Sequence, residues 1–385
     1  MGLRWEKLLE FTRGEVREES REIARLKRKS SLGEADIEEV LELADLYLRK
    51  RNSPRAEACL RDVIIHAEAD EEEILEACNM FEKMGKYELA LEGYRRIDVM
   101  GDEGALPLYR MGRLLELQGR FDEAVRFHIK AIEREPDNPE CYYRLGVAFT
   151  KSRRYDDAEK MYRTAIATDP THSKSYTNLG YILDLSGRRS AALQQFRKAV
   201  QHNPRNAEAH FNLGALYGEE GDKEQAIKEF RIGLEIDPSS VEGHYNLGLA
   251  LINENQYDDA AGEFRKILKL ESDNVNALFY LGFIYYRKGV YGKSLKYLEQ
   301  AARLNPGNAT ILSYVGKCLN RLEQPDRAIE YFKKANEINP DDTNIHFGLG
   351  ISYEKQDDKR KARECYRMAA GVSHETAPEQ GQPAE

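Results

Sequence analysis

The chain has 385 residues, a formal net charge of -9 and 41% hydrophobic residues. Its acidic balance argues against a general nucleic-acid-binding protein, because neutralising phosphates requires a dense basic surface. No stretch approaches the roughly 18 to 20 uninterrupted apolar residues of a membrane-spanning helix. These features predict a protein without direct membrane insertion, for which a cytoplasmic location is the default.

The first 36 residues precede the regular part of the chain. Four charges within the first ten residues stand where a secretory signal would be apolar. Trp5, Leu8 and Leu9 have the spacing of an apolar helical stripe, so residues 1–36 are predicted to form a helical extension that covers the first repeat. The basic run REIARLKRKS that follows is interpreted either as a solvated helix or arm, or as a contact arm.

A period of 34 residues organises the chain after this extension. Position 8 of the blocks is Gly from Gly112 to Gly350, and position 20 is Ala in every block except the eighth, which has Ser294. Such recurrence predicts ten equal repeats followed by a disordered tail at 377–385, which is polar and rich in helix breakers. The ten blocks are residues 37–70, 71–104, 105–138, 139–172, 173–206, 207–240, 241–274, 275–308, 309–342 and 343–376.

Each block is predicted to contain two amphipathic helices. Apolar or small residues recur at positions 4, 7, 8 and 11 and again at 20, 24 and 27, which is helical spacing. Small residues at positions 8 and 20 would let the two helices approach closely. Position 15 is often Gly, as in Gly119 and Gly187, and this residue tolerates the left-handed conformation that ends a helix. Proline at position 32 then stops the second helix in six blocks.

This pattern resembles the tetratricopeptide repeat (TPR) family over residues 37–376. The match is strong in blocks three to ten and weaker in the first two, since block one lacks both the Gly and the Pro. The resemblance implies an all-α fold, an α-solenoid forming a right-handed superhelix of about twenty antiparallel helices. It also implies a concave groove lined by the first helix of each block.

No constellation of catalytic or metal-ligating residues is evident. His210, His244 and His346 all occupy position 4, but adjacent repeats would separate equivalent atoms by about 9 Å or more, so packing histidines are expected. The five cysteines are scattered without a CxxC pair, which predicts reduced thiols. The phosphate-binding and zinc-protease motifs are absent from the sequence. We therefore expect no enzymatic activity, no cofactor and no metal.

Asparagines recur at position 6, which the family uses for its inner surface. Asn178, Asn212 and Asn246 form this asparagine row in three successive blocks. An amide offers both a donor and an acceptor, which suits the backbone of an extended peptide. The row resembles the asparagine ladder in the repeat region of O-linked N-acetylglucosamine transferases, whose catalytic domain is absent here. A merely solvated face is the alternative.

Aromatic side chains add a second candidate feature of the groove. They supply a large contact area at low entropic cost, as binding surfaces require. At position 5, packing between neighbouring helices is an equal alternative, whereas an apolar pocket in block eight is the sharper prediction. The candidates are Phe211, Tyr245 and Phe279 at position 5, with Tyr280, Phe283 and Tyr286 in block eight.

Basic side chains are unevenly distributed along the predicted groove. A cluster in blocks three to five would attract carboxylates. A second row at position 13 has the alternative role of opposing the negative end of each first helix. The cluster consists of Arg110, Arg113, Arg144 and Lys174, and the second row of Arg287, Arg321 and Lys355.

The favoured function is a non-catalytic adaptor or scaffold that binds extended, partly acidic segments of protein partners in the groove. One alternative is a self-associating structural scaffold, since no capping helix follows block ten and the apolar edge around Tyr366 and Met368 would lack a cover. Another is a regulatory subunit of a separately encoded enzyme, such as a glycosyltransferase or an envelope assembly machine.

Overall fold

A computed structural model describes residues 18–101 and 104–371. These residues form 21 helices and no strand, beginning with a helix over residues 18–32. The first helices of the ten blocks are α2 (Ile37–Arg49), α4 (Glu71–Lys83), α6 (Leu106–Leu117), α8 (Pro139–Lys151), α10 (Ser173–Leu185), α12 (Ala207–Glu219), α14 (Val241–Asn253), α16 (Val275–Arg287), α18 (Ala309–Arg321) and α20 (Thr343–Lys355). The second helices are α3 (Ser53–Ile65), α5 (Tyr87–Met100), α7 (Phe121–Arg134), α9 (Tyr155–Thr168), α11 (Arg189–His202), α13 (Lys223–Ile236), α15 (Tyr257–Leu270), α17 (Tyr291–Leu304), α19 (Pro325–Ile338) and α21 (Lys359–Ala369).

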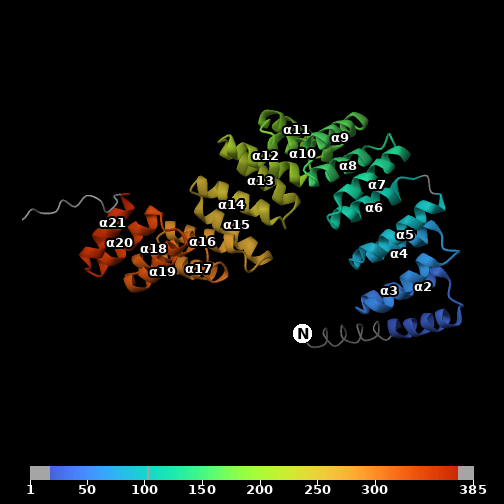
Figure 1. Ribbon diagram of the computed structural model, residues 1–385, viewed down its shortest axis with the longest axis horizontal. Helices are drawn as coiled ribbons and strands as arrows, with labels where there is room; N and C mark the ends of the chain where they lie inside the picture. Colours follow the sequence, from blue (N-terminus) through green and yellow to red (C-terminus); the bar gives the residue numbers. More distant parts are fainter. Residues whose placement is uncertain (1–17, 102–103, 372–385) are drawn as a thin grey trace, which may run out of the picture. The chain divides into compact units, whose positions relative to one another are not determined.

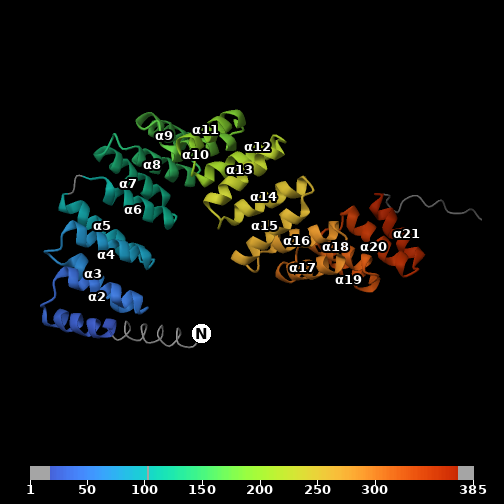
Figure 2. The same cartoon turned by 180° about the vertical axis from the view of Figure 1, so that it is seen from behind.

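The chain divides into two compact units, unit 1 (residues 1–202) and unit 2 (residues 203–385). Within each unit the two helices of a block pack together, and the second helix packs against the next block, as in α4, α5 and α6 of unit 1 (Figure 1 and Figure 2). The predicted all-α solenoid of helix pairs is therefore confirmed. The unit boundary falls inside block five, directly after α11.

The turn between the two helices has the same geometry in every block. Position 15 has a positive φ throughout, including the five blocks in which it is not Gly, such as Arg153 with a φ of 59°. The next residue closes the turn, as in the hydrogen bond of 2.8 Å from the Arg154 N–H to the Phe149 carbonyl. This hydrogen bond satisfies a carbonyl that the helix end leaves open. The turn therefore forms even where the sequence lacks the predicted glycine.

The glycine at position 8 faces a large side chain at position 24 of the same block. A Cβ added to Gly248 would lie 2.7 Å from Cζ of Phe264, well inside normal contact. In block two position 8 is Cys78 instead of glycine, and the close approach involves position 23, where a Cβ on Gly93 would lie 2.3 Å from the Cys78 Sγ. The two helices of a block thus approach closely for the reason that the sequence predicts.

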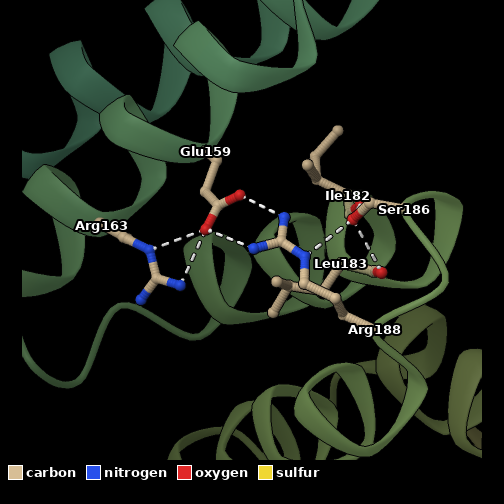
Figure 3. Close-up of polar contacts among 6 residues, drawn as sticks. All are labelled: Glu159, Arg163, Ile182, Leu183, Ser186 and Arg188. Atoms are coloured by element: carbon tan, nitrogen blue, oxygen red, sulfur yellow. Dashed lines mark hydrogen bonds and ion pairs between the residues drawn. The ribbon is translucent and has the colours of Figure 1, made fainter.

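Polar side chains also link neighbouring blocks. In unit 1, Arg188 donates to Glu159 of α9 with a shortest distance of 2.5 Å, and Arg163 donates to the same carboxylate at 2.8 Å (Figure 3). The Arg188 Nε also donates to the Ser186 hydroxyl at 3.0 Å. These contacts tie the turn after α10 to the preceding block.

The helix over residues 18–32 packs on block one. Leu26 is fully buried in a cluster with Leu43, Leu46 and Tyr47. Some basic side chains of this helix form ion pairs, such as that of 2.5 Å between Lys29 and Glu39 of α2. The basic run at residues 21–30 thus lies entirely in a helix that packs on block one, whereas Trp5, Leu8 and Leu9 lie outside the described residues. Among the helices that the structure describes, none has the length and apolarity needed to cross a bilayer.

Candidate functional site

The arginines of the predicted basic cluster already have carboxylate partners in unit 1. Arg110 and Arg113 of α6 both pair with Glu82 of α4, the former at 3.9 Å. The Tyr94 hydroxyl donates to the same carboxylate at 2.7 Å. Glu82 is largely buried, so this group is an internal network that joins blocks two and three.

Arg144 is enclosed in the same way. It pairs with Glu140 at 2.7 Å and lies 5.3 Å from the ring centroids of both Tyr109 and Tyr143. Lys174 is exposed, with its Nζ 5.9 Å from the Tyr143 ring, and forms no ion pair with any residue of the described ranges. A partner carboxylate would have to compete with Glu82 and Glu140 for most of this cluster.

The asparagine row is divided between the two units. Asn178 belongs to unit 1, and its Nδ2 donates to the Tyr162 hydroxyl at 3.2 Å. Asn212 and Asn246 belong to unit 2, are partly exposed and make no side-chain hydrogen bond within the described residues. The two amides in unit 2 are therefore available to a ligand, whereas Asn178 is already used.

Two of the aromatic candidates fill space between helices. The ring of Phe211 lies against the backbone of Gly233 and Gly243, where an added Cβ would come within 2.4 and 2.7 Å of it. Tyr280 stacks on Phe264 with ring centroids 5.1 Å apart. Burial, and to a smaller extent a hydrogen bond with Tyr245, raises the pKa of Tyr280 to about 12. Packing accounts for these positions.

The other aromatic candidates continue this packing into block nine. Tyr245 meets Tyr280 edge to face at 5.6 Å. Phe279, Phe283 and Tyr286 each contact Tyr314 of α18, with centroid distances of 5.6, 5.7 and 5.8 Å. Tyr286 lies at the end of this cluster and also forms one wall of a pocket.

That pocket, here called the C-terminal pocket, has a volume of about 440 Å³ and lies entirely in unit 2. Its walls come mainly from α18 and α20, at positions 2, 5, 6, 9, 12 and 13 of the blocks, which are the inner-surface positions of the family. It combines apolar, cationic and amide groups. The lining residues are Tyr286, Tyr291, Lys317, Asn320, Arg321, Glu323, Asn344, Phe347, Gly348, Ile351 and Lys355.

Three cations surround the C-terminal pocket, but only one of them is paired. Lys355 contacts Glu323 at 2.7 Å, whereas Lys317 and Arg321 form no ion pair with any residue that the structure describes. Burial lowers the pKa of Lys317, whose Nζ lies 4.6 Å from the Tyr314 ring centroid. Hydrogen bonding with Tyr286 raises the pKa of Arg321. Two of the three cations therefore have no carboxylate within ion-pair distance among the described residues, and only the more distant charge of Asp342 acts on Lys317.

The framework of the pocket is fixed by a buried amide. Asn320 donates from Nδ2 to the Gly348 carbonyl at 3.1 Å and accepts from the Ser352 hydroxyl at 2.9 Å. These bonds hold α18 against α20. By contrast, the Phe347 side chain is 55% exposed. A rigid wall thus carries an exposed aromatic ring beside two unpaired cations.

Sequence reasoning identified only part of this pocket. Tyr286, Arg321 and Lys355 were among the candidates, although Arg321 and Lys355 were also explained by the helix dipole. Lys317 and Phe347 were not singled out, although both occupy inner-surface positions, 9 and 5, and that register was the signal that could have found them.

The position-4 histidines are buried, as the packing interpretation predicts. His210 lies 2.6 Å from Glu229 through Nδ1 and 3.1 Å from the Pro204 carbonyl through Nε2, and His244 has equivalent contacts one block later. No group of three or more potential ligands is placed to hold a metal ion within the described ranges. All five cysteines are free thiols, and burial raises the pKa of Cys78 to about 12.

Family comparisons agree with the repeat architecture. Models of the tetratricopeptide repeat match residues 115–179, 207–240, 245–309 and 284–343, and a further TPR repeat model matches residues 185–221. Together these matches span more than half of the chain. No curated protein matches the sequence.

Several solved structures resemble the chain at 20% sequence identity. YrrB, described as a TPR protein with an unusual peptide-binding site, aligns over 48% of this chain and 95% of its own with a TM-score of 0.43. PilF of Pseudomonas aeruginosa aligns over 58% and 99% with a TM-score of 0.48. The C-terminal part of a TPR repeat-containing protein from Cytophaga hutchinsonii aligns over 63% and 99% with a TM-score of 0.49. At these values the likeness concerns the fold and says nothing about a ligand.

Repeats of this type typically form non-catalytic scaffolds for protein–protein interaction. The family matches and the ten helix pairs of equal period show that this chain belongs to the tetratricopeptide-repeat proteins.

Proposed function

We propose that the chain is a non-catalytic adaptor whose unit 2 binds extended acidic segments of protein partners, with the C-terminal pocket receiving their carboxylates. The observation that supports this proposal is the pair of cations without carboxylate partners, Lys317 and Arg321, beside the exposed ring of Phe347. An acidic side chain next to an apolar one would match both features of this pocket.

Unit 2 is a better candidate for this role than the basic cluster of unit 1. There, Glu82 and Glu140 already neutralise the arginines, so a ligand would have to break existing ion pairs. In the C-terminal pocket, folding has already removed part of the water around Lys317. A carboxylate that approaches this lysine meets a charge in a less polar surrounding, where their attraction is stronger than in bulk water.

Asn212 and Asn246 would extend the binding surface along α12 and α14. Their free amides can each donate to and accept from the main chain of an extended segment. Main-chain bonds of this kind do not depend on the side chains of the partner. We therefore assign selectivity to the C-terminal pocket and sequence-tolerant affinity to these two asparagines.

A synthetic pentapeptide tests the proposal directly. Fluorescein-labelled EEFEE, with QQFQQ as its uncharged counterpart, is titrated with the full chain and followed by fluorescence anisotropy. A hydrogen bond to a charged group contributes about 1.5 kcal/mol or more, so Lys317→Met should weaken EEFEE binding about tenfold. QQFQQ should bind more weakly than EEFEE to the wild type and should not respond to the substitution.

Lys333→Met is the matched control, because Lys333 is exposed on α19 and does not line the pocket. Circular dichroism establishes that both variants are folded. If Lys317→Met and Lys333→Met bind EEFEE as tightly as the wild type, the pocket does not receive carboxylates and the proposal is wrong. Extending EEFEE on both sides with Gly and Ser residues should add affinity that Asn212→Ala with Asn246→Ala removes.

A further inference from the structure

The C-terminal pocket lies beside the helix from which the last residues of the chain emerge. Tyr366 of α21 contacts Phe347 of the pocket wall, with ring centroids 5.6 Å apart. The same ring lies against Gly350 of α20, where an added Cβ would be 2.4 Å away. Gly371, the last residue described, follows Tyr366 by little more than one helical turn. The described chain therefore ends little more than one helical turn after a residue that contacts the pocket wall, and Figure 1 shows α21 as the last helix of the described chain.

Residues 372–385 have a charge opposite to that of the pocket. The sequence VSHETAPEQGQPAE contains Glu375, Glu379 and Glu385 and has neither Lys nor Arg. Lys317 and Arg321 in the pocket have no carboxylate within ion-pair distance among the described residues. The chain thus supplies, next to its unpaired cations, a segment with the acidic chemistry that they would bind.

The length of this segment is sufficient for the contact. An extended chain spans about 3.3 Å per residue, so Glu375 reaches about 13 Å from Gly371 and Glu379 about 26 Å. Helix α20, which carries one wall of the pocket, has 13 residues and is about 20 Å long. At least two of the three glutamates are therefore within reach of the pocket.

We propose that residues 372–385 regulate the C-terminal pocket by occupying it in the same molecule and competing with acidic partner segments. This inference rests on the proposed function, because both ligands use the same cations. Two groups joined by a short stretch of the same chain meet at an effective concentration in the millimolar range. A tail that binds with a dissociation constant of about 0.1 to 1 mM would then weaken partner binding about two- to tenfold.

The test removes the tail charges in the full chain. The variant with Glu375→Gln, Glu379→Gln and Glu385→Gln should bind EEFEE about two- to tenfold more tightly than the wild type. The control variant removes the same number of negative charges at three exposed glutamates that do not line the pocket, through Glu220→Gln, Glu224→Gln and Glu330→Gln. It should leave the affinity unchanged. In the Lys317→Met background the tail variant should also have no effect.

The possible outcomes separate this inference from the proposed function. If no variant binds EEFEE, the proposed function itself fails. If binding depends on Lys317 but is the same for the wild type and both charge variants, only the regulation by the tail is overturned. An equal gain in the tail variant and its control would show a general charge effect and also overturn it. A gain that grows with protein concentration would assign the tail to a second copy and refute occupation within one molecule.

Discussion

Gly248→Ala tests the packing rule that sets the distance between the two helices of a block. The new Cβ would lie 2.7 and 2.8 Å from Cζ and Cε2 of Phe264, against normal carbon contacts of about 3.5 to 4.0 Å. Phe264 is fully buried and stacks on Tyr280 at 5.1 Å, so its ring has little room to withdraw. Overpacking costs about 1 to 3 kcal/mol, and the upper end applies here. Because Ala gains about 1 kcal/mol over Gly inside a helix, the net loss should be about 2 kcal/mol.

Gly262→Ala is the matched control within the same block. Gly262 lies in α15, and an added Cβ would meet no atom within 4 Å. This substitution should therefore raise the free energy of unfolding by about 1 kcal/mol. Urea unfolding followed by far-ultraviolet circular dichroism measures both changes, and hydrogen exchange of α14 and α15 locates them, since repeat arrays can unfold in parts.

A double variant determines whether the clash with Phe264 is the cause. Phe264→Val removes the ring atoms that the new Cβ would meet. In that background Gly248→Ala should no longer destabilise the protein and should show the helix-propensity gain of about 1 kcal/mol. A loss of about 2 kcal/mol in both backgrounds, or a gain for Gly248→Ala alone, would refute the reasoning.

Three further substitutions test the turn, the pocket and the links between blocks. Arg153→Gly should raise the free energy of unfolding by about 0.5 to 1 kcal/mol in denaturant titrations, because Arg153 has a φ of 59° that Gly adopts without strain. Lys317→Met should raise the melting temperature at neutral pH, because burial lowers the pKa of Lys317 and disfavours its charged form. That cost is present below the folded-state pKa and disappears as the pH passes the ordinary lysine value, so the melting temperatures should converge in alkali. The hydrogen bond from Arg188 lowers the pKa of Glu159 and thereby stabilises the folded protein when this carboxyl is ionised. The stabilisation is complete above the pKa of the unfolded carboxyl and is lost as the pH falls through the folded-state pKa. Glu159→Gln should therefore flatten the decline in stability below about pH 4.5 in acid titrations.

The helix pairs could be predicted from the sequence because each depends on residues close together in one block. Gly248 and Phe264 lie at fixed positions of the period, and their sizes alone indicate which helices approach. The positive φ at Arg153 was less evident, since its own residue type does not favour it. There the closing hydrogen bond and the packing of both helices determine the turn.

The charge pairing could not be predicted, because it depends on contacts between blocks. Arg113 lies at an inner-surface position and was expected to be available to a ligand, but Glu82 of the preceding block neutralises it. Lys317, at the same position 9, forms no ion pair with a described residue and is affected only by the more distant charge of Asp342, a difference that its position in the repeat does not indicate. Whether a basic side chain is available therefore depends on one residue of a neighbouring repeat, which a single-block pattern does not reveal.

The same position of the repeat serves packing in one block and is exposed in another. At position 5, Phe279 contacts Tyr314 of the next block at 5.6 Å. Phe347 has this position in block ten, and the described residues contain no later helix pair for it to contact. Phe347→Ala should consequently cost little stability, whereas Phe279→Ala should cost about 3 kcal/mol, the lower end for a core phenylalanine that is partly exposed.

The affinities for EEFEE should show the opposite order. Loss of the Phe347 ring should weaken binding about fivefold, since an aromatic contact in a binding site contributes about 1 kcal/mol or more. Phe279→Ala should leave affinity unchanged under conditions in which it is folded, because Phe279 does not line the pocket. If Phe347→Ala binds as the wild type does, its exposed ring takes no part in recognition. If Phe347→Ala loses as much stability as Phe279→Ala, the Phe347 ring contributes to the core of the folded protein and the argument from its exposure is wrong.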